Sequence, residues 1–109
     1  MASDTASLKS AFKRFVELVE PIEDVYYVTA IEPRRPDIFT YIRVPDNEVM
    51  TRIFSAEKVV NNEFPEILVD FHIVFLQDRP IEDFVRPLPE LMYVRQDLKR
   101  KEMKRGVKG

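Results

Sequence analysis

The stretch EILVDFHIVFLQ, residues 66–77, is the longest nearly apolar run in this sequence of 109 residues. Its β-branched and aromatic residues favour a strand, in which alternate side chains leave on opposite faces. One face is wholly apolar and consists of Ile67, Val69, Phe71, Ile73 and Phe75. The other face is mixed and consists of Leu68, Asp70, His72, Val74 and Leu76. Because strands with apolar side chains on both faces are typical of sheet interiors, and even the mixed face holds three apolar residues, we expect a central strand here.

Two helices are predicted to cover the apolar face of this strand. The first spans residues 7–19, with Ser7 or Asp4 as the cap, and Pro21 ends it. Its apolar side chains recur at helical spacing: Leu8, Ala11, Phe12, Phe15 and Val19. The second runs from the capping residue Asp46 to about residue 62, and Pro65 bars its extension. Its stripe is Val49, Ile53, Ala56 and Val60.

The other expected elements complete a small sheet. Residues 24–32 and 38–44 are rich in strand-forming side chains, and the short turn between them predicts an antiparallel hairpin. Residues 80–86 predict a short helical turn, and residues 91–95 predict a final edge strand. The fold class is therefore α+β, a two-layer sandwich of order αββαβ(β). We expect a mostly antiparallel sheet of three or four strands, with both helices on one face.

Composition limits the possible chemistry. The chain has no cysteine, which excludes disulfides, thiolate metal sites and cysteine nucleophiles. Its two glycines, Gly106 and Gly109, both lie near the end, so no glycine-rich phosphate loop exists. No run approaches the roughly 20 apolar residues of a membrane span, and the first residues do not resemble a signal peptide. We expect a cytoplasmic protein without a cofactor.

The element order is similar in outline to the cytoplasmic domains of cation-efflux transporters. The similarity includes the step Phe64-Pro65 before a strand that carries a histidine. The resemblance concerns topology, and topology does not determine function. The metal sites of that family are not transferred, because His72 is the only histidine in this chain.

Asp70 and His72 are the strongest candidates for chemistry. Two residues apart in a strand, their side chains leave the same face and could form an acid–base pair or two metal ligands. A metal site normally needs three or four ligands, and only carboxylates remain to complete one here. We therefore favour a structural role for this pair, and a small metal-dependent or hydrolytic enzyme centred on it is an alternative hypothesis.

Charge is unevenly distributed along the chain. Residues 1–94 hold ten basic and seventeen acidic residues, whereas residues 95–109 hold seven basic and two acidic ones. We expect one α+β domain over residues 1–95 and a flexible basic tail over residues 96–109. The tail could contact nucleic acid through Lys99, Arg100, Lys101, Lys104 and Arg105. Such binding is a second alternative hypothesis, because the acidic body offers no basic groove.

Arginines beside prolines in the turns are a further possible feature. If the turns lay at one end of the sheet, they could form an anion site, although solvated surface charge is the simpler interpretation. The residues concerned are Arg34, Arg35, Arg79 and Arg86.

The mixed face of the 66–77 strand needs a partner. With aromatic residues from the hairpin it would form an apolar patch, and such patches on small proteins usually mark an interface. A twofold homodimer is the commonest solution. We expect a candidate interface at Leu68, Asp70, His72, Val74 and Leu76. The favoured hypothesis is a non-enzymatic module that self-associates through its sheet face and serves as an accessory or partner-binding protein.

Overall fold

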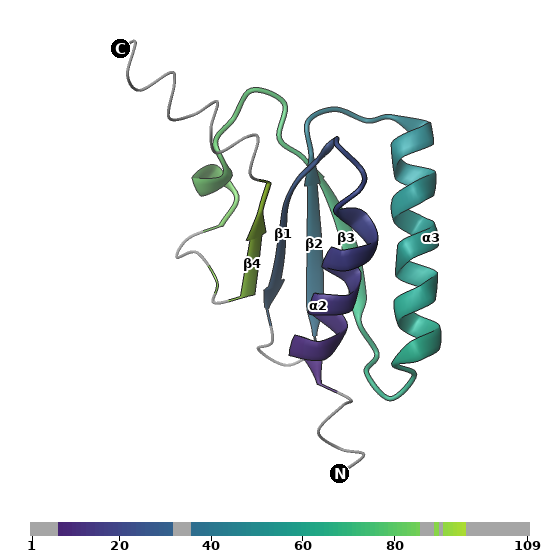
Figure 1. Cartoon of the computed structure of the whole chain (residues 1–109). Coiled ribbons are helices and arrows are strands. Elements are labelled where there is room, and N and C mark those ends of the chain that lie inside the picture. The colour runs from purple at the N-terminus through teal and green to yellow at the C-terminus, as the bar shows by residue number, and fades with distance from the viewer. Residues whose placement is uncertain (1–6, 32–35, 86–88, 90, 96–109) are drawn as a thin grey trace.

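The computed structural model describes residues 7–31, 36–85, 89 and 91–95. Figure 1 shows two layers, with both helices on the same face of a four-stranded sheet. This confirms the predicted α+β class and the predicted order of elements. The elements are α2 Leu8–Val19, β1 Val25–Ile31, β2 Asp37–Ile42, α3 Asn47–Glu63, β3 Asp70–Phe75, η1 Ile81–Asp83 and β4 Leu91–Val94. Within the described residues, no helix has the length and apolar character that crossing a membrane requires.

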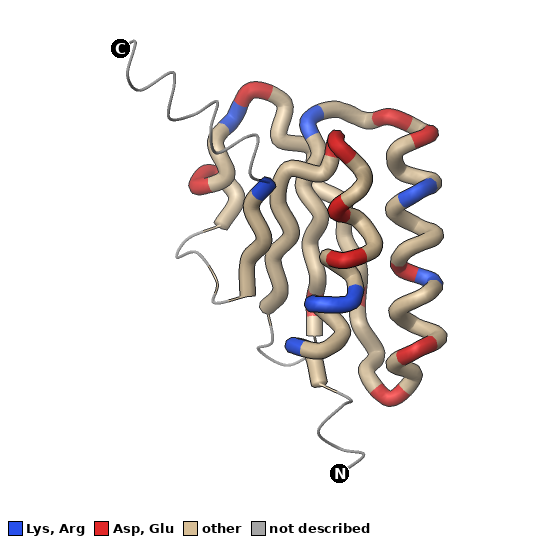
Figure 2. Tube along the Cα trace, in the orientation of Figure 1, with Lys and Arg blue, Asp and Glu red and all other residues tan. Residues whose placement is uncertain are grey.

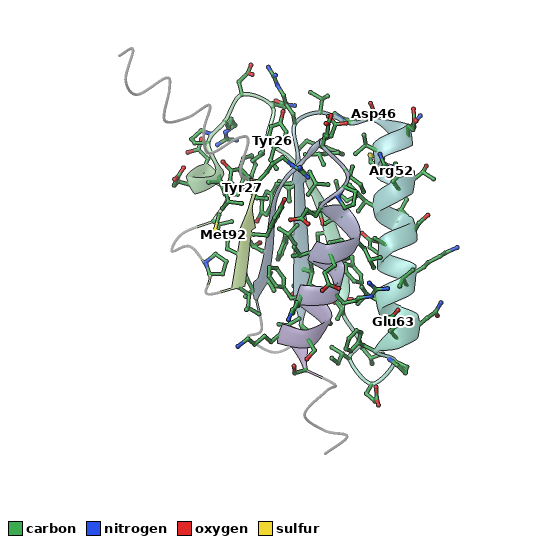
Figure 3. All side chains as sticks on the ribbon, viewed as in Figure 1. Tyr26, Tyr27, Asp46, Arg52, Glu63 and Met92 are labelled. Atoms are coloured by element: carbon green, nitrogen blue, oxygen red, sulfur yellow. The ribbon has the colours of Figure 1, made fainter. Side chains whose placement is uncertain are left out.

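Side-chain caps fix the starts of both helices. The Ser7 hydroxyl accepts a hydrogen bond from the Ser10 N–H at 3.1 Å, and the Asp46 carboxylate accepts one from the Val49 N–H at 3.1 Å. Each cap satisfies a backbone donor that the first helical turn leaves without a partner. Asp46 was the predicted cap of α3, and Ser7 was one of two predicted caps of α2. Figure 3 labels Asp46 at the upper end of α3 and Glu63 near its lower end.

The strand order is β3-β2-β1-β4. β1 pairs antiparallel with β2 and with β4, so the predicted hairpin and the predicted edge strand are both confirmed. β2 and β3 are parallel, and their register runs from Asp37 opposite Asp70 to Ile42 opposite Phe75. A parallel pair needs a crossover connection, which α3 supplies on the helical face. The sheet is therefore mixed, although two of its three pairings are antiparallel.

The prediction of a central position for the 66–77 strand is wrong, because β3 lies at an edge of the sheet. Its apolar side chains on both faces have two separate partners, because the helices pack on one face of β3 and the second cluster covers the C-terminal end of the other. Phe71, Ile73 and Phe75 pack on the main core under the helices, and Val74 and Leu76 join a second cluster on the other face. The side-chain pattern of a strand indicates which of its faces are buried. Which strands lie beside it in the sheet depends instead on backbone hydrogen bonds.

β3 is also shorter than the apolar run. Pairing with β2 begins where the Asp70 N–H donates to the Pro36 carbonyl at 2.9 Å. The preceding residues form a turn instead, in which the Ile67 N–H donates to the Phe64 carbonyl at 3.1 Å. Leu68 therefore lies in the connection between α3 and β3, and it is 80% exposed.

The main core lies between the helices and the sheet. Phe15 of α2 meets Phe71 of β3 with ring centroids 5.1 Å apart. The predicted stripes of both helices are buried in full: Leu8, Ala11, Phe12, Phe15, Val19, Val49, Ile53, Ala56 and Val60. Their burial holds the helical layer on the sheet, because each leucine, isoleucine, valine or phenylalanine side chain removed from water contributes about 1.5–3 kcal/mol.

Arg95 fastens the end of β4 to the connection between α2 and β1. Its guanidinium donates to the Val25 carbonyl at 2.6 Å, the Glu20 carbonyl at 2.8 Å and the Ile22 carbonyl at 2.6 Å. These carbonyls lie at and beyond the C-terminal end of α2, where a cation is favoured by the helix dipole. The backbone N–H of Arg95 also donates to the Tyr26 carbonyl at 3.0 Å.

We predict that Thr40→Val increases stability. Thr40 is fully buried, and among the described residues its hydroxyl is the buried side-chain group without a hydrogen-bond partner. Replacing the hydroxyl with a methyl group removes an unsatisfied polar atom, so the free energy of unfolding should rise by about 1 kcal/mol. Urea denaturation measures this change.

Thr29→Val is the matched control for this substitution. Thr29 is also fully buried, but its hydroxyl hydrogen-bonds the Tyr41 hydroxyl at 3.1 Å. The same chemical change should therefore lower stability by about 1 kcal/mol. Equal effects at the two positions would contradict this account.

We predict that Arg95→Met destabilises the fold by about 2 kcal/mol or more, because three carbonyls lose a charged donor. Thermal and urea unfolding measure the loss. The control is Arg43→Met, which removes an exposed ion pair with Asp78 and should change stability by less than about 0.5 kcal/mol. Similar losses in both variants would argue against the clamp.

Candidate functional site

His72 lies on the outer face of the sheet, the face opposite the helices. Its ring stacks on the Phe39 ring of β2, with centroids 4.5 Å apart and planes 17° from parallel. Its Nε2 atom is 3.0 Å from Oδ1 of Asp37, at hydrogen-bonding distance. The side chains of His72 and Asp37 are 44% and 25% exposed, so the group is open to solvent.

The carboxylate that meets His72 is therefore Asp37, which the sequence did not suggest. The prediction considered Asp70, because it lies two residues away on the same strand. Asp37 lies 35 positions before His72 and reaches it only because β2 and β3 pair in parallel, with Phe39 beside His72. No pattern within a single strand carries that information.

The described residues contain no group of three or more His, Cys, Asp or Glu side chains that could hold a metal ion. The Asp37–His72 pair supplies one imidazole and one carboxylate, which is fewer than the three protein ligands of a typical catalytic zinc site. The arrangement fixes the orientation of the imidazole and presents a flat aromatic surface.

The protein itself covers one part of the outer face. The segment after β3 folds back over it, and a second cluster forms there from Tyr27, Tyr41, Leu76, Ile81 and Val85. Figure 3 labels Tyr27 and Met92 on the side of the sheet where β1 meets β4. Leu76 was expected at an interface, but it is only 4% exposed in this cluster and offers almost no surface to another molecule.

Aromatic contacts hold this cover in place. The Tyr41 and Tyr27 rings meet edge to face with centroids 6.2 Å apart, and the centroid of the Phe84 ring lies 6.5 Å from that of Tyr41. The Arg79 guanidinium lies 5.2 Å from the centroid of the Phe84 ring. Burial raises the pKa of Tyr41, and its hydrogen bond with Thr29 opposes this in part. Tyr41 is thus a structural group of the second cluster.

The outer face is more open near the start of β2 and along β3. Ile31 is 38% exposed and is paired with Asp37, which contacts His72. Phe39 and Val74 are half-buried at the border of the second cluster. We call Ile31, Phe39, His72 and Val74 the outer patch. Of the five residues predicted at the interface, His72 and Val74 belong to this patch.

The edge of β3 adjoins the outer patch. The Asp70 N–H donates to the Pro36 carbonyl just before β2 at 2.9 Å, and the Leu76 N–H donates to the Ile42 carbonyl of β2 at 2.8 Å. Because backbone groups alternate in direction along a strand, those of Phe71, Ile73 and Phe75 point away from β2. Among the described residues, β2 is the only strand that pairs with β3. The structure thus presents a strand edge with backbone donors and acceptors.

Glu57 of α3 lies near the same edge. Burial raises the pKa of its carboxyl group to about 7, and the charge of His72 opposes this to a smaller extent. The opposite flank of α3 faces α2, because Glu63 accepts two hydrogen bonds from Arg14 at 3.0 and 3.2 Å. Helical spacing places Met50 and Phe54 on the flank of Glu57, and Phe54 is 47% exposed.

Two other sites were predicted, the basic tail and the arginines in the turns, and most of their residues lie outside the part of the chain that the structure describes. Lys99, Arg100, Lys101, Lys104 and Arg105 lie outside it, as do Arg34, Arg35 and Arg86. Arg79 follows the C-terminal end of β3, whereas the residues that flank 32–35 lie at the opposite end of the sheet. Figure 2 shows the charged residues of the described chain mainly on the helices and connections, with few on the strands.

Comparison of this chain with protein-family models, with curated proteins and with solved structures finds no match.

We predict that stability falls as pH rises from about 4.5 to 7, in proportion to the ionisation of Glu57. Its pKa is about 7 in the folded protein and 4.5 for an ordinary glutamate, so the folded state binds more protons in this window. Glu57→Gln should flatten this part of the stability profile, measured by urea denaturation at several pH values. Glu66→Gln, on the exposed connection before β3, is the control and should leave the profile unchanged.

Proposed function

We propose that this protein is a small non-enzymatic module that self-associates through the outer face of its sheet and serves as an accessory or partner-binding protein. The observation that carries the proposal is the outer patch, where the Phe39–His72 stack lies open beside an available strand edge. Apolar and aromatic surface that the chain leaves exposed is typical of an interface. A cytoplasmic location belongs to the same proposal.

The composition of the outer patch favours a protein partner. It combines an aromatic ring, an imidazole and aliphatic side chains, with the Asp37 carboxylate at its border. Aromatic side chains surrounded by polar groups are enriched where protein interfaces are most strongly stabilised. The helices pack on the other face of the sheet. Within the described residues, the outer patch and the adjoining β3 edge are therefore surfaces that a partner could bind.

Two other functions remain hypotheses from the sequence. Nucleic-acid binding would use the basic residues 96–109, which lie outside the described residues. An enzymatic role centred on Asp70 and His72 would have to include Asp37, since this carboxylate hydrogen-bonds the imidazole.

We predict a dimer in solution that Val74→Lys weakens. Val74 borders the outer patch, and a lysine there would bring two like charges towards a twofold axis. Light scattering after size exclusion should give about twice the chain mass for the natural sequence and a shift towards monomer for the variant.

Val44→Lys is the matched control, because Val44 is 52% exposed on the connection between β2 and α3. It should remain dimeric. Thermal unfolding of both variants separates a loss of association from a loss of folding. A natural protein that stays monomeric at high concentration would overturn the proposed function.

A further inference from the structure

We propose that two copies of this chain join through the edges of β3, antiparallel to each other, so that their sheets form one continuous sheet. This inference rests on the proposed self-association and places the contact between the copies at the β3 edge beside the outer patch, not on the outer face itself. Phe71, Ile73 and Phe75 supply the backbone donors and acceptors, since the N–H and C=O groups of these three residues point away from β2. An exposed edge of this kind is a ready template for another strand.

The two edges of the sheet differ in how well they are protected. Natural edges are blunted by short length, lysine, proline or bulges. β4 is four residues long and is followed by Arg95. β3 has the sequence DFHIVF, with no lysine, arginine or proline, and its register with β2 is continuous. The edge of β3 is therefore the one suited to strand pairing.

A symmetric register makes a second copy the natural occupant of this edge. A twofold axis perpendicular to the sheet and centred on Ile73 places Phe71 opposite Phe75 of the second copy. Phe71, Ile73 and Phe75 are then all paired with the second copy. Each of these three pairs exchanges two backbone hydrogen bonds, which gives about six in total. Moving the axis along the strand by one residue places an outward residue opposite the 66–69 turn or opposite Gln77. Neither can pair in this way. The Val69 N–H already donates to the Ile67 carbonyl, and Gln77 has a positive φ of 56° and donates its N–H to the Arg43 carbonyl.

Side chains are compatible with this register on both faces. On the helical face, Phe71 meets Phe75 of the second copy and Ile73 meets its own equivalent. On the outer face, His72 lies opposite Val74, and Asp70 lies opposite Leu76 of the second copy. No two like charges are opposite each other, which would destabilise a cross-strand pair. An axis centred on His72 would instead place two imidazoles opposite each other.

The helical layer also gains a contact from this arrangement. The axis keeps all helices on one side of the continuous sheet, so the two α3 helices lie beside the seam. The flanks that face away from α2 then approach each other, and these flanks carry Met50, Phe54 and Glu57. Phe54 is 47% exposed in the single chain. The seam would thus combine backbone pairing with burial of this aromatic side chain.

Disulfide trapping tests the register directly, because the natural chain contains no cysteine. His72→Cys and Val74→Cys proteins are mixed under reducing conditions, allowed to exchange subunits and then oxidised. Opposite residues of a non-hydrogen-bonded pair lie about 4.5 Å apart at Cα, within reach of a disulfide. The mixture should give a covalent dimer on a non-reducing gel. Each variant oxidised by itself should give no covalent dimer.

Ile73→Pro is the second test, with Ile73→Ala as its matched control. Proline removes the outward N–H at the centre of the seam, while the hydrogen bonds of β3 to β2 are retained. Alanine also shortens the side chain but keeps that N–H. Light scattering should show Ile73→Pro as a monomer and Ile73→Ala as a dimer, and thermal unfolding should confirm that both are folded.

The outcomes separate this inference from the proposed function. A natural protein that is monomeric overturns both. A dimer that survives Ile73→Pro and gives no mixed disulfide overturns edge pairing and leaves self-association through the outer face. A covalent dimer from His72→Cys by itself overturns the register centred on Ile73.

Discussion

The parallel pairing of β2 with β3 is the constraint on which the rest of the structure depends. Parallel strands cannot be joined by a tight turn, so the chain crosses the helical face as α3 before β3 begins. This crossover brings α3 beside α2, and the Arg14–Glu63 ion pair links the two helices. The same pairing places His72 beside Phe39 and within hydrogen-bonding distance of Asp37. The helical layer and the candidate site therefore share one origin.

The outer face shows how a small protein divides its apolar surface. The two helices cover one face of the sheet, with fully buried side chains on β1 and β2 and partly buried ones on β3 and β4. The segment around η1 covers part of the other face, where Tyr41 and Leu76 are buried. Among the described residues, the outer patch next to β3 stays open. This exposed aromatic surface is the feature on which the proposed interaction role rests.

Two features of the edge region act against maximum stability in the single chain. Glu57 is partly removed from water, so its carboxyl group ionises only near pH 7. Phe54 exposes nearly half of its surface on the same flank of α3. If the stability of the single chain alone mattered, a neutral polar side chain at either position would be less unfavourable than the present residue. Their position beside the open strand is consistent with a second molecule at this edge.

The sequence by itself determined the elements, their caps and the core. Helical spacing identified every buried side chain of the stripes in α2 and α3, since a helix buries one face irrespective of its neighbours. Alternation in residues 66–77 correctly assigned Phe71, Ile73 and Phe75 to the core. Only the tertiary structure decided that β3 lies at an edge, that Asp37 meets His72, and that Leu76 is covered by the protein's own chain. The physical reason is that side-chain patterns record which faces are buried, whereas lateral strand order follows from backbone pairing between distant segments.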